Sequence, residues 1–260
     1  MARPSPPPPL RALLGFAALL LLWQAVVAMR WVPEEYLPGV PAVLRAVAEQ
    51  FGDRAFWISE ALTLARAVGG LLLATASGIG AAVLAARYRV VERALAPLVQ
   101  IMLSLPPAAL VPLSIFALGL GAPLFAFIIW YAGVWVIYLG ANNALRASEP
   151  VQLHVARTLG YGPWETLWHV RLPAAAPEIF TALRLAAAGA LMATVAAEML
   201  AGKDGLGFML YDTAFSLQIP PMFALLLVAG FNGVLLNQAV LWLRRRIAGW
   251  HARLSAIAQN

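Results

Sequence analysis

The sequence predicts an all-α, polytopic membrane protein with about six transmembrane helices. Of the 260 residues, 62% are hydrophobic and only 12% are charged, whereas soluble domains carry roughly 25% charged residues. The mean hydropathy is +0.79. A spanning helix needs roughly 20 apolar residues, and six stretches approach or exceed that length: Ala12–Met29, Ala67–Ala86, Ala94–Leu120, Pro123–Leu145, Ile179–Ala201 and Met222–Leu243.

The first apolar stretch follows a proline-rich segment. Residues 1–11 are expected to form a disordered tail, because proline disfavours regular helix. Residues 12–250 form a single domain, and residues 251–260 form a C-terminal tail. The first stretch is alternatively a signal peptide, since Arg3 and Arg11 precede it and Val26-x-Ala28 resembles a cleavage site. Cleavage would leave the later topology unchanged.

Small residues mark the second stretch as a helix that packs closely on a neighbour. They recur at every fourth position: Gly70, Ala74, Gly78 and Ala82. Such a ridge lets two helix backbones approach each other. We assign it a packing role only.

Three prolines interrupt the third stretch, namely Pro106, Pro107 and Pro112. Proline removes a helical hydrogen bond and bends or breaks the helix. Broken helices of transporters line the path of the solute, which makes Ser104 and Ser114 possible lining groups. The alternative is a kink that serves packing alone.

Basic residues predict the orientation. If the N-terminus is cytoplasmic and six spans follow, most of the 18 lysines and arginines lie on the inner side. The positive-inside rule then places both termini and residues 146–178 in the cytoplasm. The outer side receives Arg30, Arg45, Arg54, Arg66 and Lys203.

The external segment Arg30–Arg66 is expected to contain a short amphipathic helix. Apolar residues recur there at helical spacing, and they are Val40, Val43, Leu44, Val47 and Phe51. Pro41 suits the first turn of that helix. We expect the helix to lie on the outer surface.

The inner segment 146–178 is polar and rich in turn residues. Leu153, Ala156 and Leu159 fall on one face of a first short helix, which Gly160 ends by adopting a left-handed conformation. This part of the chain also carries basic residues such as Arg157.

A second short helix is expected to begin at Gly162-Pro163 and to stop at Leu172-Pro173. Trp164, Leu167 and Trp168 share one of its faces. Paired tryptophans on an exposed helix favour docking into a partner's groove over a solvated loop.

The same segment resembles the EAA motif of ATP-binding-cassette (ABC) importer permeases. That motif reads E-A-A, three residues, G, nine residues, then I-x-L-P. Here Ala156, Gly160 and Val170-Arg171-Leu172-Pro173 match its spacing, while His154 stands in place of Glu and Val155 in place of Ala. Residues 103–121 and 172–210 are similar to the nitrate/sulfonate/taurine group, and the resemblance covers about residues 31–250.

The resemblance implies a type I ABC importer permease (MetI-like) fold in a bacterial inner membrane. Its partners would be a second permease copy, a cytoplasmic ABC ATPase that binds ATP and Mg, and a periplasmic solute-binding protein. The solute would be a sulfonate, nitrate, taurine-like or other small organic anion. The ATPase-coupling loop 146–178 would use His154, Ala156, Arg157, Gly160, Gly162, Trp164, Trp168, Val170, Leu172 and Pro173.

Two charged residues fall inside the fifth predicted span. Glu198 is either a gate or coupling group at the dimer axis or a hydrogen-bonded group near the outer helix end, because a lone carboxylate is costly in lipid. Arg184 either reaches lipid headgroups or acts at the inner gate. Gly205 and Gly207 are expected in a tight outer turn beside this path.

The residue patterns of enzymes are missing. The one lysine, Lys203, is followed by Asp204, so no phosphate-binding G-x-x-x-x-G-K-[ST] loop exists. His154 and His169 lack helix-spaced partners and predict no metal site. We therefore expect no enzyme activity, no cofactor in this chain and no nucleic-acid partner. A self-contained carrier driven by an ion gradient is the alternative, but it would usually show internal repeats, and none is visible.

Overall fold

The computed structural model describes residues 8–147 and 150–248. Over these ranges four helices are long and apolar enough to cross a membrane: α3 (Arg54–Arg87), α6 (Ala122–Arg146), α11 (Ile219–Ile247) and the continuous helical segment Pro163–Ala201. A bent pair, α4 (Arg89–Ser104) and the segment Pro107–Leu118, can count as a fifth span. Helix α1 (Pro8–Ala28) contributes a shorter apolar stretch.

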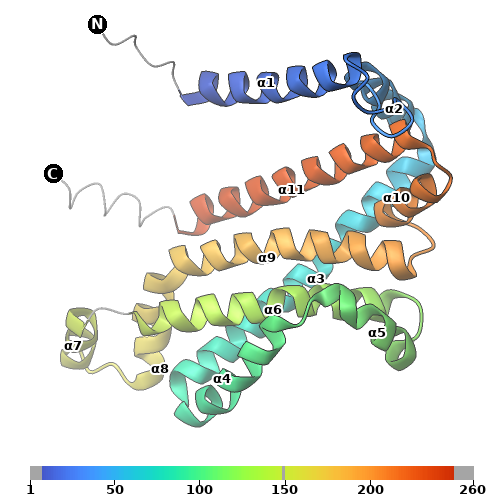
Figure 1. Ribbon diagram of the computed structural model, residues 1–260. Coiled ribbons are helices and arrows are strands. Elements are labelled where there is room, and N and C mark those ends of the chain that lie inside the picture. The colour runs from blue at the N-terminus through green and yellow to red at the C-terminus, as the bar shows by residue number, and fades with distance from the viewer. Residues whose placement is uncertain (1–7, 148–149, 249–260) are drawn as a thin grey trace, which may run out of the picture.

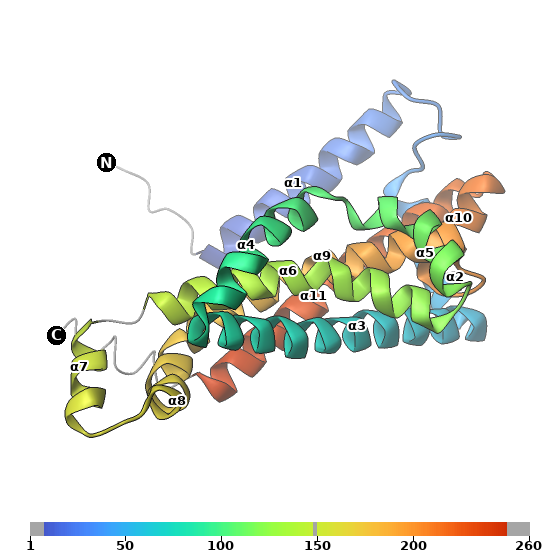
Figure 2. The same cartoon turned by 90° about the horizontal axis from the view of Figure 1, so that it is seen from below.

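The helices run between two ends of an elongated bundle (Figure 1). One end, which we call the α7 end, holds α7 (Pro150–Thr158), α8 (Pro163–Thr166), the start of α1 and the last turn of α11. Figure 2 shows the same separation from below. The opposite end, which we call the α2 end, holds α2 (Val40–Gly52), α5 (Val111–Leu118) and α10 (Leu206–Phe215).

The centre of the bundle is formed by α3, α6 and α9 (Leu172–Ala201), which pack on one another. All four residues of the small-residue ridge on α3 are buried, as the sequence predicts. Gly70 lies so close to Ile129 of α6 that a Cβ at this position would overlap that side chain. Gly78 faces Ile137 in the same way, with 3.1 Å from its would-be Cβ to the Ile137 side chain. The ridge therefore sets the close approach of α3 to α6.

Large apolar side chains cover the outside of the bundle. Phe116 is 90% exposed, and Leu19, Leu72 and Phe231 are also exposed. Monomeric soluble proteins rarely carry apolar surface on this scale, whereas lipid tails are its natural environment. The surface thus agrees with the composition of the chain.

The proline break in the third predicted span is confirmed. Helix α4 ends at Ser104, a short 3₁₀ turn covers Pro107–Leu110, and α5 then runs to Leu118. The two halves are bent by 93°. The break falls at Leu105 and Pro106, because a residue before proline avoids the helical conformation.

Two helices begin earlier than the predicted apolar stretches. Helix α3 starts at Arg54, ahead of Ala67, so Arg54 and Arg66 are helical residues. Helix α1 starts at Pro8, so residues 8–11 are helical rather than part of the tail. Proline is tolerated in a first turn, where its missing N–H would lack a partner anyway. Residues 1–7 and the predicted tail 251–260 lie outside the described residues.

The amphipathic helix expected near residue 40 exists as α2, with Pro41 in its first turn. Its buried face is different from the predicted one. Val43 and Ala46 are buried, while Leu44 and Phe51 are exposed. Helix α2 packs against α11, and this contact covers part of its surface.

Candidate functional site

The polar segment at the α7 end contains a tight reversal of the chain. Helix α7 ends at Thr158, and Gly160 follows with a left-handed φ of +78°. The Gly160 and Tyr161 N–H groups donate to the carbonyls of Arg157 and Ala156, both at 3.0 Å. Only glycine adopts this conformation without strain. The predicted end of the first short helix is confirmed.

Helix α8 begins where the sequence predicts. Gly162 precedes the helix, and Pro163 occupies its first turn. The Glu165 carboxylate accepts a hydrogen bond of 2.7 Å from the Gly162 N–H. An acidic group at this position satisfies a free N–H and interacts favourably with the positive end of the helix dipole.

The predicted stop at Leu172-Pro173 is wrong. Residues Leu167–Arg171 form a π turn that leads directly into α9, with the Leu172 N–H donating to the Leu167 carbonyl. Pro173 lies in the first turn of α9, where a residue without an N–H is tolerated. The result is one helical segment of 39 residues, Pro163–Ala201. At 1.5 Å per residue it is about 58 Å long, well beyond a hydrocarbon core of about 30 Å.

An apolar groove of about 510 Å³ runs along α7, lined by Val151, His154, Val155, Thr158 and Leu159. We call these five residues the α7 face. Val151, Val155 and Leu159 are 70%, 53% and 65% exposed. Such a row of exposed valine and leucine side chains is suited to contact with another protein.

The opposite side of α7 faces the rest of the chain. Ala156 is buried and Leu153 is half-buried, and α7 contacts the π turn. The predicted grouping of Leu159 with these two residues is wrong, because Leu159 lies beyond the last residue of α7 and is exposed.

The two tryptophans of the second helix are largely exposed, but they do not share a face with Leu167. Leu167 is buried, while Trp164 and Trp168 are exposed. Three further predicted site residues, Val170, Leu172 and Pro173, are half-buried where the π turn meets α9. The motif residues thus divide into a buried set that fixes the junction and an exposed set on α7 and α8.

A second polar site lies at the α2 end, around the fully buried carboxylate of Glu198. Thr63 donates its hydroxyl to this carboxylate at 2.8 Å, and Arg66 donates Nη1 at 2.7 Å. The N–H of Gly207 donates at 3.0 Å. The sequence left two alternatives for Glu198: a gate or coupling group, or a hydrogen-bonded group near a helix end. These contacts are the ones that the second alternative requires.

The Glu198 cluster joins three parts of the fold. Thr63 and Arg66 lie on α3, Glu198 lies on α9, and Gly207 lies in the first turn of α10. Thr63 also accepts the N–H of Leu206 at 2.8 Å. The start of α10 therefore points two N–H groups at the acidic cluster, where the helix dipole favours a negative charge.

Arg66 extends the cluster to the loop before α10. Its Nη2 lies 2.5 Å from Oδ1 of Asp204, and its guanidinium stacks 4.2 Å from the centroid of the Phe125 ring. Gly205 turns this loop with a φ of +94°, and a Cβ there would overlap the Glu198 carboxylate. The expected turn at Gly205 is thus built around Glu198.

Sequence reasoning missed Thr63 and Arg66 as partners of Glu198. It also missed Glu60, whose buried carboxylate accepts a 3.1 Å hydrogen bond from Asn232 of α11. These residues precede the charge-free stretch and were assigned to the external segment. The usable signal was their spacing, because Glu60, Thr63 and Ala67 recur at helical intervals in line with the small-residue ridge.

The remaining path candidates lie apart from the Glu198 cluster in the chain. Ser104 is exposed and donates to the Gln100 carbonyl at 2.9 Å, while Ser114 is buried and donates to the Leu110 carbonyl at 2.8 Å. Both hydroxyls thus bond to a carbonyl four residues earlier in the chain. Pro106 and Pro107 form the break itself. Arg184 is exposed near the middle of the segment Pro163–Ala201.

Within residues 8–147 and 150–248, no group of three or more His, Asp or Glu residues is arranged to hold a metal ion. The polar groups at the two sites instead make helix ends, ion pairs and hydrogen bonds. In both sites these contacts join helices to one another or to the loops between them.

Comparison with known proteins gives the family. The chain is 28% identical over 243 residues to the taurine transport system permease protein TauC of Escherichia coli (strain K12), covering 92% of this chain and 88% of that protein. It is 32% identical over 193 residues to the bicarbonate transport system permease protein CmpB of Synechococcus elongatus, covering 74% and 69%. The nitrate import permease protein NrtB of Leptolyngbya laminosa is 31% identical over 192 residues, covering 74% and 68%.

The fold also matches a solved structure, the inward-facing MetNI methionine ABC transporter. The TM-score is 0.57 at 18% identity, covering 81% of this chain and 98% of the matched chain. This match supports the MetI-like fold. Residues 78–249 match the family described as the inner membrane component of binding-protein-dependent transport systems. The chain belongs to that family and is a permease component of an ABC importer.

Proposed function

We propose that this chain forms the membrane path for a small anion and is driven by a separate ATPase that docks on the α7 face. The observation that carries the proposal is an exposed apolar row, formed by Val151 and Val155 of α7 and by Leu159 just after it, that precedes a continuous spanning segment. An apolar helix face of this kind fits a hydrophobic groove on a partner. The ATPase would bind ATP and Mg, and the chain itself would supply no cofactor.

Force would pass from the ATPase into the membrane through α8 and α9. Trp164 and Trp168 are exposed on the first turns of the segment Pro163–Ala201, which follows α7 in the chain. Because this segment is continuous across the π turn, a displacement of α8 displaces the spanning helix with it. His154 replaces the glutamate of the family motif, so apolar contact carries more of the docking in this chain than an acidic side chain does.

The path itself would lie along α9, against a second copy of the permease. Arg184 is exposed in the spanning segment, with exposed Leu185 and Ala188 beside it. A charged side chain at membrane depth needs water, a partner or a headgroup. A water-filled path between two copies would satisfy it, and its charge would attract an anion. The proline break at Pro106 and Pro107 would place free carbonyls near the same path.

The solute is proposed to be a small oxyanion or sulfonate that a periplasmic binding protein delivers to the α2 end. The named relatives are permease proteins for taurine, bicarbonate and nitrate. Placing the chain in a bacterial inner membrane with both termini and α7 in the cytoplasm agrees with the basic residues of the α7 end, which include Arg87, Arg157 and Arg171.

The ATPase interface is tested by a charge on the α7 face. Val155→Asp places a carboxylate in the proposed apolar contact, and Gln152→Asp places one on an exposed neighbour outside the groove. We expect Val155→Asp to abolish co-purification of the ATPase and ATP-dependent uptake, while Gln152→Asp retains both. Full retention by Val155→Asp would contradict the proposal. Uptake that persists without the ATPase would favour the ion-driven carrier.

A further inference from the structure

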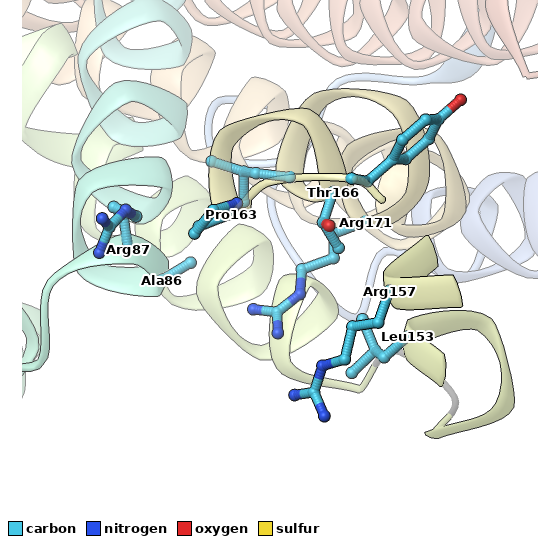
Figure 3. A pocket seen from close by; sticks show the side chains of 9 residues that line it. Ala86, Arg87, Leu153, Arg157, Pro163, Thr166 and Arg171 are labelled. Carbon is cyan, nitrogen blue, oxygen red and sulfur yellow. The ribbon is translucent and has the colours of Figure 1, made fainter. Parts of the chain in front are cut away.

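A basic pocket lies between the end of α3 and the α7–α8 pair, on the other side of α7 from the α7 face. Its volume is about 390 Å³. Three arginines from three elements line it: Arg87 at the end of α3, Arg157 on α7 and Arg171 at the end of the π turn. Figure 3 shows Arg157 and Arg171 extending toward the same side, with Arg87 on the opposite flank. We call this the arginine pocket.

Among the residues that the structure describes, no acidic side chain lines the arginine pocket. The other lining residues are uncharged, and they include Leu153, Tyr161 and Thr166. The ion pairs found among residues 8–147 and 150–248 join Arg66 to Glu198 and Asp204, and Arg146 to Glu92. None of the three pocket arginines takes part in them. Guanidinium groups that line one pocket repel one another, and a bound anion would offset this repulsion.

Two of the pocket arginines also have an Nε–H donor that lacks an acceptor. The Nε atoms of Arg87 and Arg171 are both buried, and neither has a hydrogen-bond partner among the described residues. Arg87 does stack on the Tyr88 ring, with 4.9 Å from Cζ to the ring centroid, but a ring face supplies no oxygen acceptor. A buried donor without an acceptor is destabilising, so the pocket is short of acceptor oxygens as well as negative charge.

We propose that the arginine pocket is a binding site for a phosphate group, supplied by the headgroup of an anionic phospholipid. The guanidinium group donates two parallel hydrogen bonds to phosphate oxygens, and arginine is the side chain best suited to that geometry. A phosphate bound between the three arginines would supply both the negative charge and the acceptor oxygens that these side chains lack. A free phosphate ion would use the same chemistry.

The depth of the pocket favours a lipid as the source. Ala86 and Arg87 are the last residues of a spanning helix, so the pocket opens where hydrocarbon gives way to headgroups. Leu84 and Tyr88 next to it are both exposed. An aromatic ring and an arginine at the end of a spanning helix are the residues found at headgroup level. The bound phosphate would tie α3 to the α7–α8 pair, and this role does not require the proposed ATPase contact.

The test measures lipid retention by the full-length chain purified in detergent, using native mass spectrometry. The protein is titrated with phosphatidylglycerol, which is anionic, or with phosphatidylcholine, which is zwitterionic. The pocket variant is R87Q/R157Q/R171Q. The matched control is R244Q/R245Q/R246Q, which removes equal charge from exposed residues at the same end of the bundle.

We expect wild type and the control to prefer phosphatidylglycerol by about tenfold or more, which is the effect of one to two charge-assisted hydrogen bonds. The pocket variant should lose this preference. Arg157→Gln alone changes an exposed residue and should show an intermediate loss, which guards against misfolding of the triple variant. An equal preference for phosphatidylglycerol in wild type and in both triple variants would overturn the proposal that the arginine pocket binds this lipid.

A second arm distinguishes the two sources of phosphate. Inorganic phosphate is titrated into the lipid-depleted chain by calorimetry, with the same variants. Arginine-dependent phosphate binding without a lipid preference would keep the oxyanion site but overturn the lipid as its occupant. Absence of arginine-dependent binding in both arms would overturn the proposal as a whole.

Discussion

Glu198 and Arg66 form an ion pair in which Oε1 and Nη1 are 2.7 Å apart, and this pair joins α9 to α3 inside the bundle. The carboxylate is 0% exposed. A buried charge that loses its partner is costly, because neither water nor another charge replaces the lost interaction. The pair therefore ties together the helices that carry the α2 end of the fold.

Replacing Glu198 by Gln should strongly destabilise the protein. The variant keeps the size of the side chain but leaves Asp204, which is about half exposed, as the remaining ionic partner of Arg66. We expect a loss of about 3–5 kcal/mol of unfolding free energy, seen as a lower thermal midpoint of the detergent-purified protein. Asp204→Asn, which changes a half-exposed partner, should cost no more than about 1 kcal/mol. Equal shifts of the thermal midpoint in the two variants would contradict a stabilising role for the buried Glu198–Arg66 pair.

Gly70→Ala should separate α3 from α6. The added Cβ would overlap Ile129, so the two helices must move apart or repack, at a cost of about 1–3 kcal/mol. Gly69→Ala is the matched control, since a Cβ at Gly69 meets nothing within 4 Å. We expect a lower midpoint of thermal aggregation for Gly70→Ala alone. Helix propensity favours alanine over glycine, so a control that is as unstable as Gly70→Ala would contradict the packing explanation.

The ridge and the proline break show what the sequence can predict. Small residues at every fourth position and clustered prolines are local signals, and both led to the observed structure. The start of α3 was missed because Glu60 and Arg66 look like loop residues until their partners Asn232 and Glu198 are known. Those partners lie 172 and 132 residues away in the chain, and sequence spacing does not report such contacts.

The sequence predicted the turns of the candidate site, but it did not predict that α8 continues into α9 as one helical segment. Gly160 and Gly162-Pro163 identified the reversal between α7 and α8, since each demands a particular backbone conformation. Leu172-Pro173 looked like a stop signal, yet the π turn before it lets the helix continue. The choice between ending a helix and inserting a π turn depends on packing against α7, which the local sequence does not contain.

Gly160→Val should disrupt the α7 face. Its φ of +78° is strained for a β-branched residue, by about 1–3 kcal/mol, so the reversal would relax and α7 would turn away. We expect ATPase co-purification to fall at least several-fold while the thermal midpoint of the spanning helices changes little. Gly162→Ala is the control, because Gly162 has an ordinary φ of −68°. If Gly160→Val co-purified the ATPase as well as wild type does, the conformation of this turn would not be needed for docking.

Arg184→Gln tests the proposed path along α9. If Arg184 meets the anion in a water-filled path, loss of its charge-assisted hydrogen bond should lower uptake by about tenfold. Co-purification of the ATPase should be unchanged, since Arg184 is far along the helix from α7. Arg184→Lys keeps the charge and should retain part of the uptake. Normal uptake by Arg184→Gln would exclude the side chain from the path.

The central claim is that the α7 face contacts the ATPase, and site-directed crosslinking tests it most directly. The chain contains no cysteine, so Val155→Cys and Leu217→Cys each create a single attachment point for a thiol-reactive photocrosslinker. Leu217 is exposed at the α2 end, beyond α10. In the assembled transporter we predict an adduct with the ATPase from Val155→Cys and none from Leu217→Cys. An adduct from Leu217→Cys, or none from Val155→Cys, would contradict the account.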